Sequence, residues 1–317
     1  MISPYAVQPN GIAGLTTKIM PILPTHKTTI EYLEHCRVQA ADERLVYVKR
    51  KEALEQHFAI PYGNTSVLLL GPGTSITQQA ARLAASQGML IGFCAGGATP
   101  IYLAALNEYR EPEYLQKWYP LWENPVSRLA IAKHWQTVRA ELVCKVWLKL
   151  DGVEINCREI ADNFLARVAA AADTQGVLIA EAWFAKQLYA LLSRHFSTQF
   201  TRQPKALDLT NQFLDNGNYL AYGLAACSLW ILGIPHSLPV LHGKTRRGAL
   251  VFDLADLVKD AAIMPNAFLA VANKENESQF RRRALATLDE IKALKCLFAE
   301  LTAACNGDIN PTDQPSA

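Results

Sequence analysis

The sequence has almost no excess of charge and no cysteine pattern that would determine a fold or a metal site by itself. Lysine and arginine number 31, and aspartate and glutamate 29, which leaves a formal net charge of +2. So small a charge does not indicate a nucleic-acid partner, and only the distribution of charge along the chain can. The seven cysteines are odd in number and never spaced Cys-x-x-Cys. Neither a disulfide framework nor a zinc knuckle is therefore predicted.

Long apolar runs and targeting signals are also missing. The longest apolar run, residues 222–235, is shorter than the roughly 18 residues that a membrane span needs. Residues 1–14 lack the basic start and apolar stretch of a signal peptide. Half of all residues are hydrophobic and 19% are charged, a composition typical of globular proteins. We therefore expect a reduced, soluble, cytoplasmic protein that makes no membrane contact.

The two parts of the chain differ in their periodicity. Runs of β-branched and aromatic residues at 44–50 and 65–71 indicate strands, and Ser75 with Gln78 predicts a capping box where the next helix begins. From about residue 101 onward helical patterns dominate, at 157–172, 176–196, 209–233 and 278–301. The sequence predicts an α+β fold with a small β-rich N-terminal domain over 1–100, a larger, mostly α-helical domain over 101–305 and a flexible tail over 306–317.

Two acids, Asp253 and Asp256, are embedded in an apolar helical pattern. Residues three apart lie on one helix face, about 5–6 Å from each other. Two like charges in a partly desolvated place need a positive partner, and a divalent cation would serve. The alternative is a pair of surface acids in the first turn of a helix, where the helix dipole favours them. From this pair alone the alternative is the commoner case.

Glu181 and His242 could complete a ligand set with these acids. Glu181 stands in the apolar helical pattern of 176–196, where a carboxylate caps a helix, pairs with an arginine or serves a site. His242 lies in the loop that leads into the acid-bearing helix. Carboxylates with one imidazole suit Mn²⁺ or Mg²⁺, and the lack of thiolates nearby argues against structural zinc.

Basic residues lie between the histidine and the aspartates, at Lys244, Arg246 and Arg247. Metal-binding acids flanked by cations suit an anionic substrate, above all a phosphodiester. The alternative is a solvated loop whose arginines pair with local acids. That alternative is the stronger one for the run 281–283, because three adjacent arginines cannot share one helix face.

Two further motifs have structural explanations. The stretch 71–79 lacks the Lys-Ser/Thr ending of a phosphate-binding loop, so we interpret its glycines as a tight turn. The tryptophans of the region 117–135 could stack on exposed bases of a DNA end, but core packing is the more frequent use of such side chains. These tryptophans are Trp118, Trp122 and Trp135.

Three segments together resemble one family, the CRISPR-associated spacer-acquisition integrases, first described as metal-dependent endonucleases. Residues 68–97 are similar to the family's strand, Gly-Pro-Gly turn, helix and next strand. Residues 220–243 resemble its long helix, Gly-x-x-Pro turn and Leu-His pair, and residues 246–260 resemble its acidic signature. The region 107–135 looks most like the I-F subtype.

The resemblance implies a ligand set for a divalent cation, Mn²⁺ or Mg²⁺. Glu181, His242 and Asp256 match the family's metal ligands, while Asp253 matches an acid needed for activity that sits beside the metal. Many members follow the acids with Pro-Phe-Arg-Pro. Here residues 257–265 read LVKDAAIMP, which leaves open whether Lys259 takes the place of that arginine.

The resemblance also implies a function and partners. The family inserts foreign DNA fragments as spacers into a CRISPR array by 3′-hydroxyl attack on a phosphodiester, and it can hydrolyse DNA. The partners implied are double-stranded DNA (prespacer and CRISPR repeat), a second copy bound largely through the N-terminal β domains, and a ferredoxin-like adaptor, fused in the I-F subtype to a helicase-nuclease. Two alternatives stay open: a DNA-binding assembly protein with a structural acid cluster, and a metal-dependent phosphohydrolase of small phosphorylated substrates.

Overall fold

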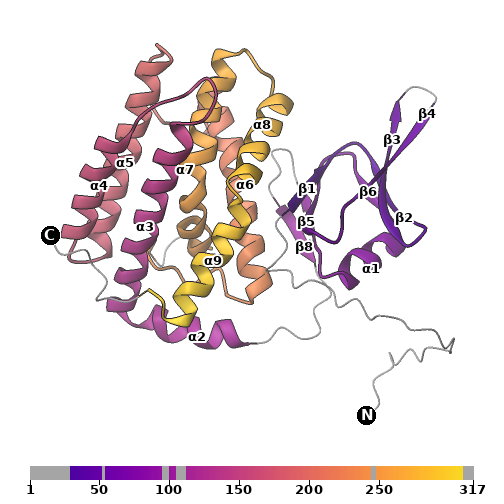
Figure 1. Ribbon diagram of the computed structural model, residues 1–317, viewed down its shortest axis with the longest axis horizontal. Coiled ribbons are helices and arrows are strands. Elements are labelled where there is room, and N and C mark those ends of the chain that lie inside the picture. The colour runs from indigo at the N-terminus through magenta and orange to yellow at the C-terminus, as the bar shows by residue number, and fades with distance from the viewer. Residues whose placement is uncertain (1–28, 52–53, 95–99, 105–111, 244–247, 310–317) are drawn as a thin grey trace.

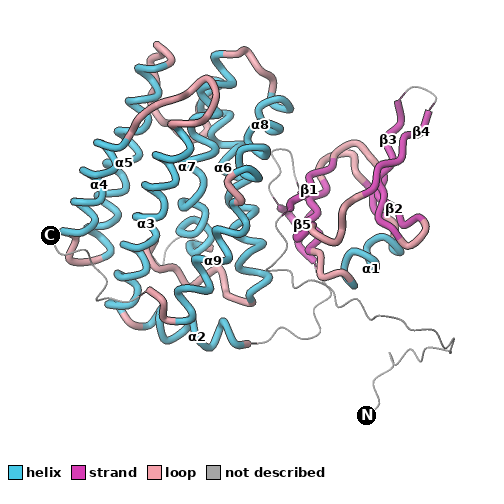
Figure 2. The backbone as a smooth tube through the Cα atoms, in the orientation of Figure 1, coloured by secondary structure: helices cyan, strands magenta, loops and turns pink. Residues whose placement is uncertain are grey.

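A computed structural model describes residues 29–51, 54–94, 100–104, 112–243 and 248–309. A strand-rich N-terminal region is followed by a mostly helical region, as the α+β prediction requires (Figure 1). Figure 2 shows the same division, with strands confined to one side of the molecule and long helices to the other. The predicted tail is mostly outside the described residues, since the last described helix ends at Asn306.

The strand-rich region contains two four-stranded sheets among the described residues. One has the order β1-β5-β7-β8, with β1, β5 and β7 parallel and β8 antiparallel, and the other has the order β4-β3-β2-β6. The elements are β1 (Thr29–Leu33), β2 (Arg37–Ala41), β3 (Arg44–Lys51), β4 (Leu54–Ala59), β5 (Thr65–Leu70), β6 (Ser75–Ile76), α1 (Gln78–Ser86), β7 (Leu90–Cys94) and β8 (Pro100–Ala104).

Strand β5 joins the two regions because it is buried on both faces. Successive side chains of a strand point to opposite faces of the sheet. Val67 and Leu69 pack into the core of the helical region, whereas Leu68 and Leu70 pack into the core of the strand-rich region. An uninterrupted apolar run is the pattern expected of such a strand, and it fixes the sheet between the two cores.

The predicted capping box at Ser75 is wrong. Ser75 lies in the short strand β6, which pairs with β2. Helix α1 begins two residues later than the prediction placed it, and the hydroxyl of Thr77 accepts a hydrogen bond from the backbone N–H of Ala80 at 3.2 Å. Both Ser and Thr are good N-cap residues, so the pairing of β6, a tertiary contact, decided which of them caps the helix.

The helical region is organised around one buried helix, α7 (Ala249–Ala272), which packs against α3, α5, α6, α8 and α9. A helix that is apolar on all sides is stable only when other elements surround it. The other helices are α2 (Glu113–Glu123), α3 (Pro125–Trp147), α4 (Arg158–Ala170), α5 (Thr174–His195), α6 (Leu209–Leu232), α8 (Glu277–Glu290) and α9 (Ala293–Asn306). No helix of the described residues has the length and hydropathy that crossing a membrane requires.

The tryptophans that could have stacked on DNA are core residues. Trp118 and Trp135 are buried with ring centroids 6.1 Å apart, and Trp122 packs against the same core. The indole N–H of Trp118 also donates to the backbone oxygen of Leu238 at 3.1 Å. The core interpretation is therefore confirmed for Trp118 and Trp135, while Trp122 is partly buried against the same core.

Two arginines of the run 281–283 pair with nearby acids, as the structural alternative predicted. Arg281 of α8 donates to the carboxylate of Glu34, just after β1, at 2.8 Å, and Arg283 pairs with Glu275. Arg282 is exposed. The Arg281 pair also links the helical region to the strand-rich region. The domain boundary at residue 100 stays a prediction, and strand β8 runs from there to Ala104.

Gly217 of α6 tests how tightly α6, α7 and α8 are packed. A Cβ at this position would overlap Cγ2 of Ile263 and lie 2.8 Å from Cζ of Phe280. Alanine normally stabilises a helix interior by about 1 kcal/mol relative to glycine, but forcing a methyl group into a filled core costs about 1–3 kcal/mol or more. We expect Gly217→Ala to lower the free energy of unfolding, as measured by urea denaturation. Gly63→Ala is the control, because nothing lies within 4 Å of its Cβ; equal stability of the two variants would contradict the packing described.

Candidate metal centre

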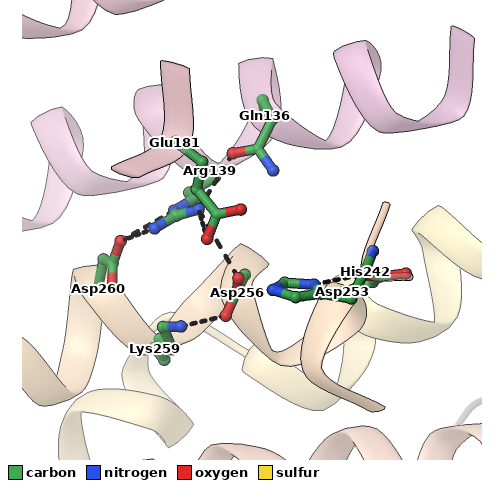
Figure 3. Close-up of polar contacts among 8 residues, drawn as sticks. All are labelled: Gln136, Arg139, Glu181, His242, Asp253, Asp256, Lys259 and Asp260. Carbon is green, nitrogen blue, oxygen red and sulfur yellow. Dashed lines mark hydrogen bonds and ion pairs between the residues drawn. The ribbon is translucent and has the colours of Figure 1, made fainter. Parts of the chain in front are cut away.

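Three side chains that are far apart in the sequence converge in the helical region. Glu181 projects from α5, Asp256 from α7, and His242 from the loop before α7 (Figure 3). Each offers one ligand atom, and the three atoms lie within 4.8 Å of one another. The structure therefore brings together the three residues that the sequence singled out as ligands.

Asp253 holds His242 in place and faces away from the cluster. One oxygen, Oδ2, accepts hydrogen bonds from the backbone N–H groups of Val240 and Leu241 at 2.8 and 3.0 Å. The other, Oδ1, accepts from the N–H of His242 at 2.9 Å and lies 2.6 Å from its Nδ1. With Nδ1 engaged, Nε2 is the nitrogen left to bind a cation. A carboxylate that orients a ligand histidine in this way is a recurrent feature of metal sites.

The surface alternative for the two aspartates is wrong. Asp253 and Asp256 are 4% and 2% exposed, because α7 is surrounded by other helices. A third acid on the same face, Asp260, is also buried at 1% exposure. Its spacing of four from Asp256 was visible in the sequence, but nothing there showed that α7 is buried on its polar face too.

Arg139 of α3 is the residue that connects these acids, and the sequence did not identify it. Its guanidinium is 1% exposed. It donates through Nε to Asp260 at 2.8 Å, lies 3.1 Å from Oε1 of Glu181 and 3.8 Å from Oδ2 of Asp256, and donates to Gln136 at 3.1 Å (Figure 3). Of the three uses considered for Glu181, the structure shows an arginine partner and a place in a cluster.

Lys259 is the second cation of the centre. Its ammonium forms an ion pair with Oδ1 of Asp256, one turn earlier on α7. Burial works against the charged form of this lysine, but Asp256 and Asp260 outweigh it and raise its pKa. Lys259 therefore stands beside the acids as a charged partner.

The two carboxylates of the ligand set have opposite protonation tendencies. Burial and the neighbouring Asp256 raise the pKa of Glu181 to about 7, against the opposing effect of Arg139. Burial also acts to raise the pKa of Asp256, but Lys259 and Arg139 lower it to about 2. Two acids this close cannot both ionise without a compensating charge, so the pair favours any cation that approaches it.

The donors present fit a hard divalent cation. Oε2 of Glu181 is buried and has no hydrogen-bond partner among the described residues, a costly arrangement unless a ligand completes it. With Glu181, Asp253, Asp256 and Asp260 ionised and His242 neutral, the four negative charges exceed the two positive charges of Arg139 and Lys259 by two, and a proton on Glu181 or His242 lowers this excess. A set of two carboxylates and one imidazole suits Mn²⁺ or Mg²⁺, and such an ion would share Asp256 with Lys259.

The basic residues predicted to contact DNA, Lys244, Arg246 and Arg247, lie outside the described residues. They connect His242 to the start of α7 along the chain. Their part in any site therefore remains a prediction from the sequence.

Comparison with known proteins gives a consistent assignment. The family model described as CRISPR associated protein Cas1 matches residues 32–301. The chain is similar to the CRISPR-associated endonuclease Cas1 of Pectobacterium atrosepticum, with 40% identity over 88% of this chain and 93% of that protein. It is equally similar, at 40% identity over 90% and 95%, to the CRISPR-associated endonuclease Cas1 of Pseudomonas aeruginosa.

Solved structures share the fold. A TtCas1–DNA complex superposes with a TM-score of 0.67 at 23% identity, covering 90% of this chain and 95% of that one. A casposase bound to integration product superposes with a TM-score of 0.64 at 11% identity, covering 91% and 94%.

The role given to Asp253 can be tested in the metal-free protein with Asp253→Asn. In either orientation the amide would point its NH₂ at two donors: the N–H groups of Val240 and Leu241, or the N–H and Nδ1 of His242. We expect a loss of about 1–3 kcal/mol in the free energy of unfolding. We also expect the imidazole proton to move from Nδ1 toward Nε2, as read from ¹⁵N chemical shifts. The control Asp162→Asn removes an exposed carboxylate and should change little. An unaltered tautomer in Asp253→Asn would show that Asp253 does not orient the ring.

Proposed function

Because the chain belongs to the Cas1 family of CRISPR-associated proteins, we propose that it is a metal-dependent DNA endonuclease and integrase that inserts DNA fragments as spacers into a CRISPR array. One observation carries this proposal: ligand atoms of Glu181, His242 and Asp256, from three separate segments, lie within 4.8 Å of one another. The names of the curated relatives, which are endonucleases, and the fold shared with a casposase bound to integration product support it.

The side chains have distinct parts in this proposal. A bound Mn²⁺ or Mg²⁺ supplies positive charge that polarises a phosphodiester and stabilises the leaving oxygen. Glu181 and Asp256 offer carboxylate oxygens, and His242 offers Nε2 because Asp253 engages Nδ1. Arg139 holds Glu181 in position by pairing with it and with Asp260. The cluster thus needs no movement of these side chains to present three ligands together.

The proposed reaction is an exchange at phosphorus. In integration the 3′-hydroxyl of the incoming DNA loses its proton as its oxygen bonds to the phosphorus, the bond from that phosphorus to the 3′ oxygen of the target strand breaks, and that oxygen takes up a proton. In hydrolysis water replaces the incoming hydroxyl. Neither reaction requires an oxidant or a change of oxidation state, which agrees with a site built from carboxylates and imidazole.

The proposed partners follow from the family. They are double-stranded DNA, a second copy of this chain bound through the strand-rich region, and a ferredoxin-like adaptor, fused to a helicase-nuclease if the I-F subtype applies. The chain covers 93% and 95% of two curated relatives, which supports carrying over the properties of the whole protein. A cytoplasmic location suits a protein that acts on DNA.

A structural role for the acid cluster is the second candidate. Arg139 and Lys259 both pair with its acids, so part of the charge is already compensated without an ion. In that case the protein would bind DNA and assemble with partners while contributing no catalysis. The buried Oε2 of Glu181, which has no hydrogen-bond partner among the described residues, favours the first candidate.

The proposal is tested by strand transfer of a labelled duplex into a repeat-bearing plasmid. We expect Glu181→Gln, His242→Ala and Asp256→Asn each to lower Mn²⁺-dependent product by at least about 100-fold, because each removes a ligand from a site whose supporting residues alone contribute 10–100-fold. EDTA should abolish the product of the unaltered protein.

The control for these variants is Glu290→Gln, which changes an exposed acid of α8. Circular dichroism and thermal melting should establish that each ligand variant is folded. Absence of product from the unaltered, folded protein would favour the structural role, and product that persists in EDTA or in a folded His242→Ala protein would contradict a metal-dependent reaction at this centre.

The basic residues between the histidine and the aspartates should govern the salt dependence of DNA binding. For each of Lys244→Ala, Arg246→Ala and Arg247→Ala, we expect the slope of log affinity against log salt to flatten by about one unit. Fluorescence anisotropy over a salt series measures this slope. Arg282→Ala, on the exposed face of α8, is the matched control. Slopes that coincide with the control would remove these side chains from the DNA interface.

A further inference from the structure

Two cysteines away from the metal centre are in contact with each other. Cys144 lies one turn before the end of α3, and Cys157 is the N-cap residue of α4. Their sulfur atoms are 3.4 Å apart, with the S–H of Cys157 directed at the sulfur of Cys144. The phosphodiester chemistry proposed above makes no use of either thiol.

The folded connection between α3 and α4 holds this pair. The N–H of Ile155 donates to the backbone oxygen of Trp147 at 2.9 Å, and the N–H of Val153 donates to that of Leu150 at 2.9 Å. Gly152 turns the chain with a φ of +76°, which favours glycine. These hydrogen bonds hold the connection against the end of α3. The two sulfurs are therefore neighbours in the folded protein.

The two thiols differ in reactivity. The hydrogen bond from Cys157 lowers the pKa of Cys144, against the effect of burial, and the charge of Arg158 lowers it further. The same hydrogen bond, together with burial, raises the pKa of Cys157. The thiolate is the nucleophile in thiol–disulfide exchange, so Cys144 is the attacking sulfur and Cys157 its protonated neighbour.

One of the two cysteines lines a pocket. It has a volume of about 520 Å³, a size typical of small-molecule sites, and its lining includes Cys144, Lys145, Arg158 and Cys296. Cys157 is not part of this lining and is 1% exposed. A small reagent in this pocket would therefore meet Cys144 and not Cys157, and Lys145 and Arg158, which outnumber Glu141 in the lining, favour one that carries carboxylates.

We propose that Cys144 and Cys157 are a reversible thiol–disulfide site that is oxidised by an anionic low-molecular-weight disulfide of the glutathione type. The thiolate of Cys144 attacks one sulfur of the small disulfide, forms a mixed disulfide and releases one small thiolate. The sulfur of Cys157 then attacks Cys144, forms the Cys144–Cys157 bond and releases the second small thiolate. The two protons of the protein thiols end on the two released thiols. The protein is oxidised by two electrons and the small disulfide is reduced.

The bond would fasten the end of α3 to the start of α4. Helix α3 carries Arg139, and α4 packs against α5, which carries Glu181 (Figure 1). Closing the short loop between the cysteines constrains the unfolded chain and is expected to raise the melting temperature by roughly 5 °C. The inference does not depend on the proposed nuclease activity, since no metal or DNA takes part.

Cys296 provides a control, because it is a cysteine in the same pocket that should not form the disulfide. It lines the same pocket, but burial and the nearby Glu300 raise its pKa to about 11. Its thiolate is therefore scarce. Cys296→Ser should leave the oxidation of the pair unchanged.

The test uses the full-length chain, equilibrated in buffers of reduced and oxidised glutathione, then alkylated and analysed by intact and peptide mass spectrometry. We expect oxidising buffer to protect two thiols, to link the peptides of Cys144 and Cys157, and to raise the melting temperature, all reversed by dithiothreitol. Cys157→Ser should instead retain one glutathionyl group on Cys144.

Three results would overturn the proposal. The first is alkylation of both thiols of the folded protein in the fully oxidised buffer. The second is a disulfide that joins Cys144 to Cys296 instead, and the third is a lower melting temperature after the bond forms. The last would mean that the native arrangement has to be distorted to make it.

Discussion

The compensation of buried charge around Arg139 is the constraint on which the helical region depends. Its guanidinium lies at the meeting point of α3, α5 and α7 and pairs with acids from two of them. Breaking one partner of a buried ion pair leaves an uncompensated charge that costs several kcal/mol. The packing of the three helices that lets Arg139 pair with these acids also brings Glu181 beside Asp256.

The candidate metal centre lies inside the core of the helical region, so the same residues affect both stability and cation binding. Helix α7 is apolar enough to be surrounded by other helices, yet it carries acids on the face that meets α3 and α5. Such acids are tolerated because Asp253 is satisfied by backbone N–H groups, Asp260 by Arg139, and Asp256 partly by Lys259. Glu181, in the ligand set, keeps a buried carboxylate oxygen that has no hydrogen-bond partner among the described residues. The pairing that stabilises the other buried acids therefore leaves the neighbourhood of Glu181 as the place where a cation can bind.

Much of the fold was predictable because its signals are local. The buried strand β5 and the long helices have periodicities that a short window of sequence records, and an α+β architecture follows from their order. The N-cap of α1 was mispredicted because Ser75 and Thr77 are equally suitable locally, and the pairing of β6 with β2 decided between them. Arg139 was missed because an arginine on one helix has no sequence relation to acids on others, and Asp260 because nothing in the sequence showed that α7 is buried on its polar face.

By itself the sequence determined which residues could serve as ligands and which family the chain resembles, since residue types and motif order are properties of the chain. It also determined the spacing that puts three acids on one face of α7. The tertiary structure alone decided that this face is buried, that Asp253 orients His242 while Asp256 points into the cluster, and that Arg139 joins the acids. The physical reason is that desolvation, which makes each of these charges require a partner, exists only once the helices have packed.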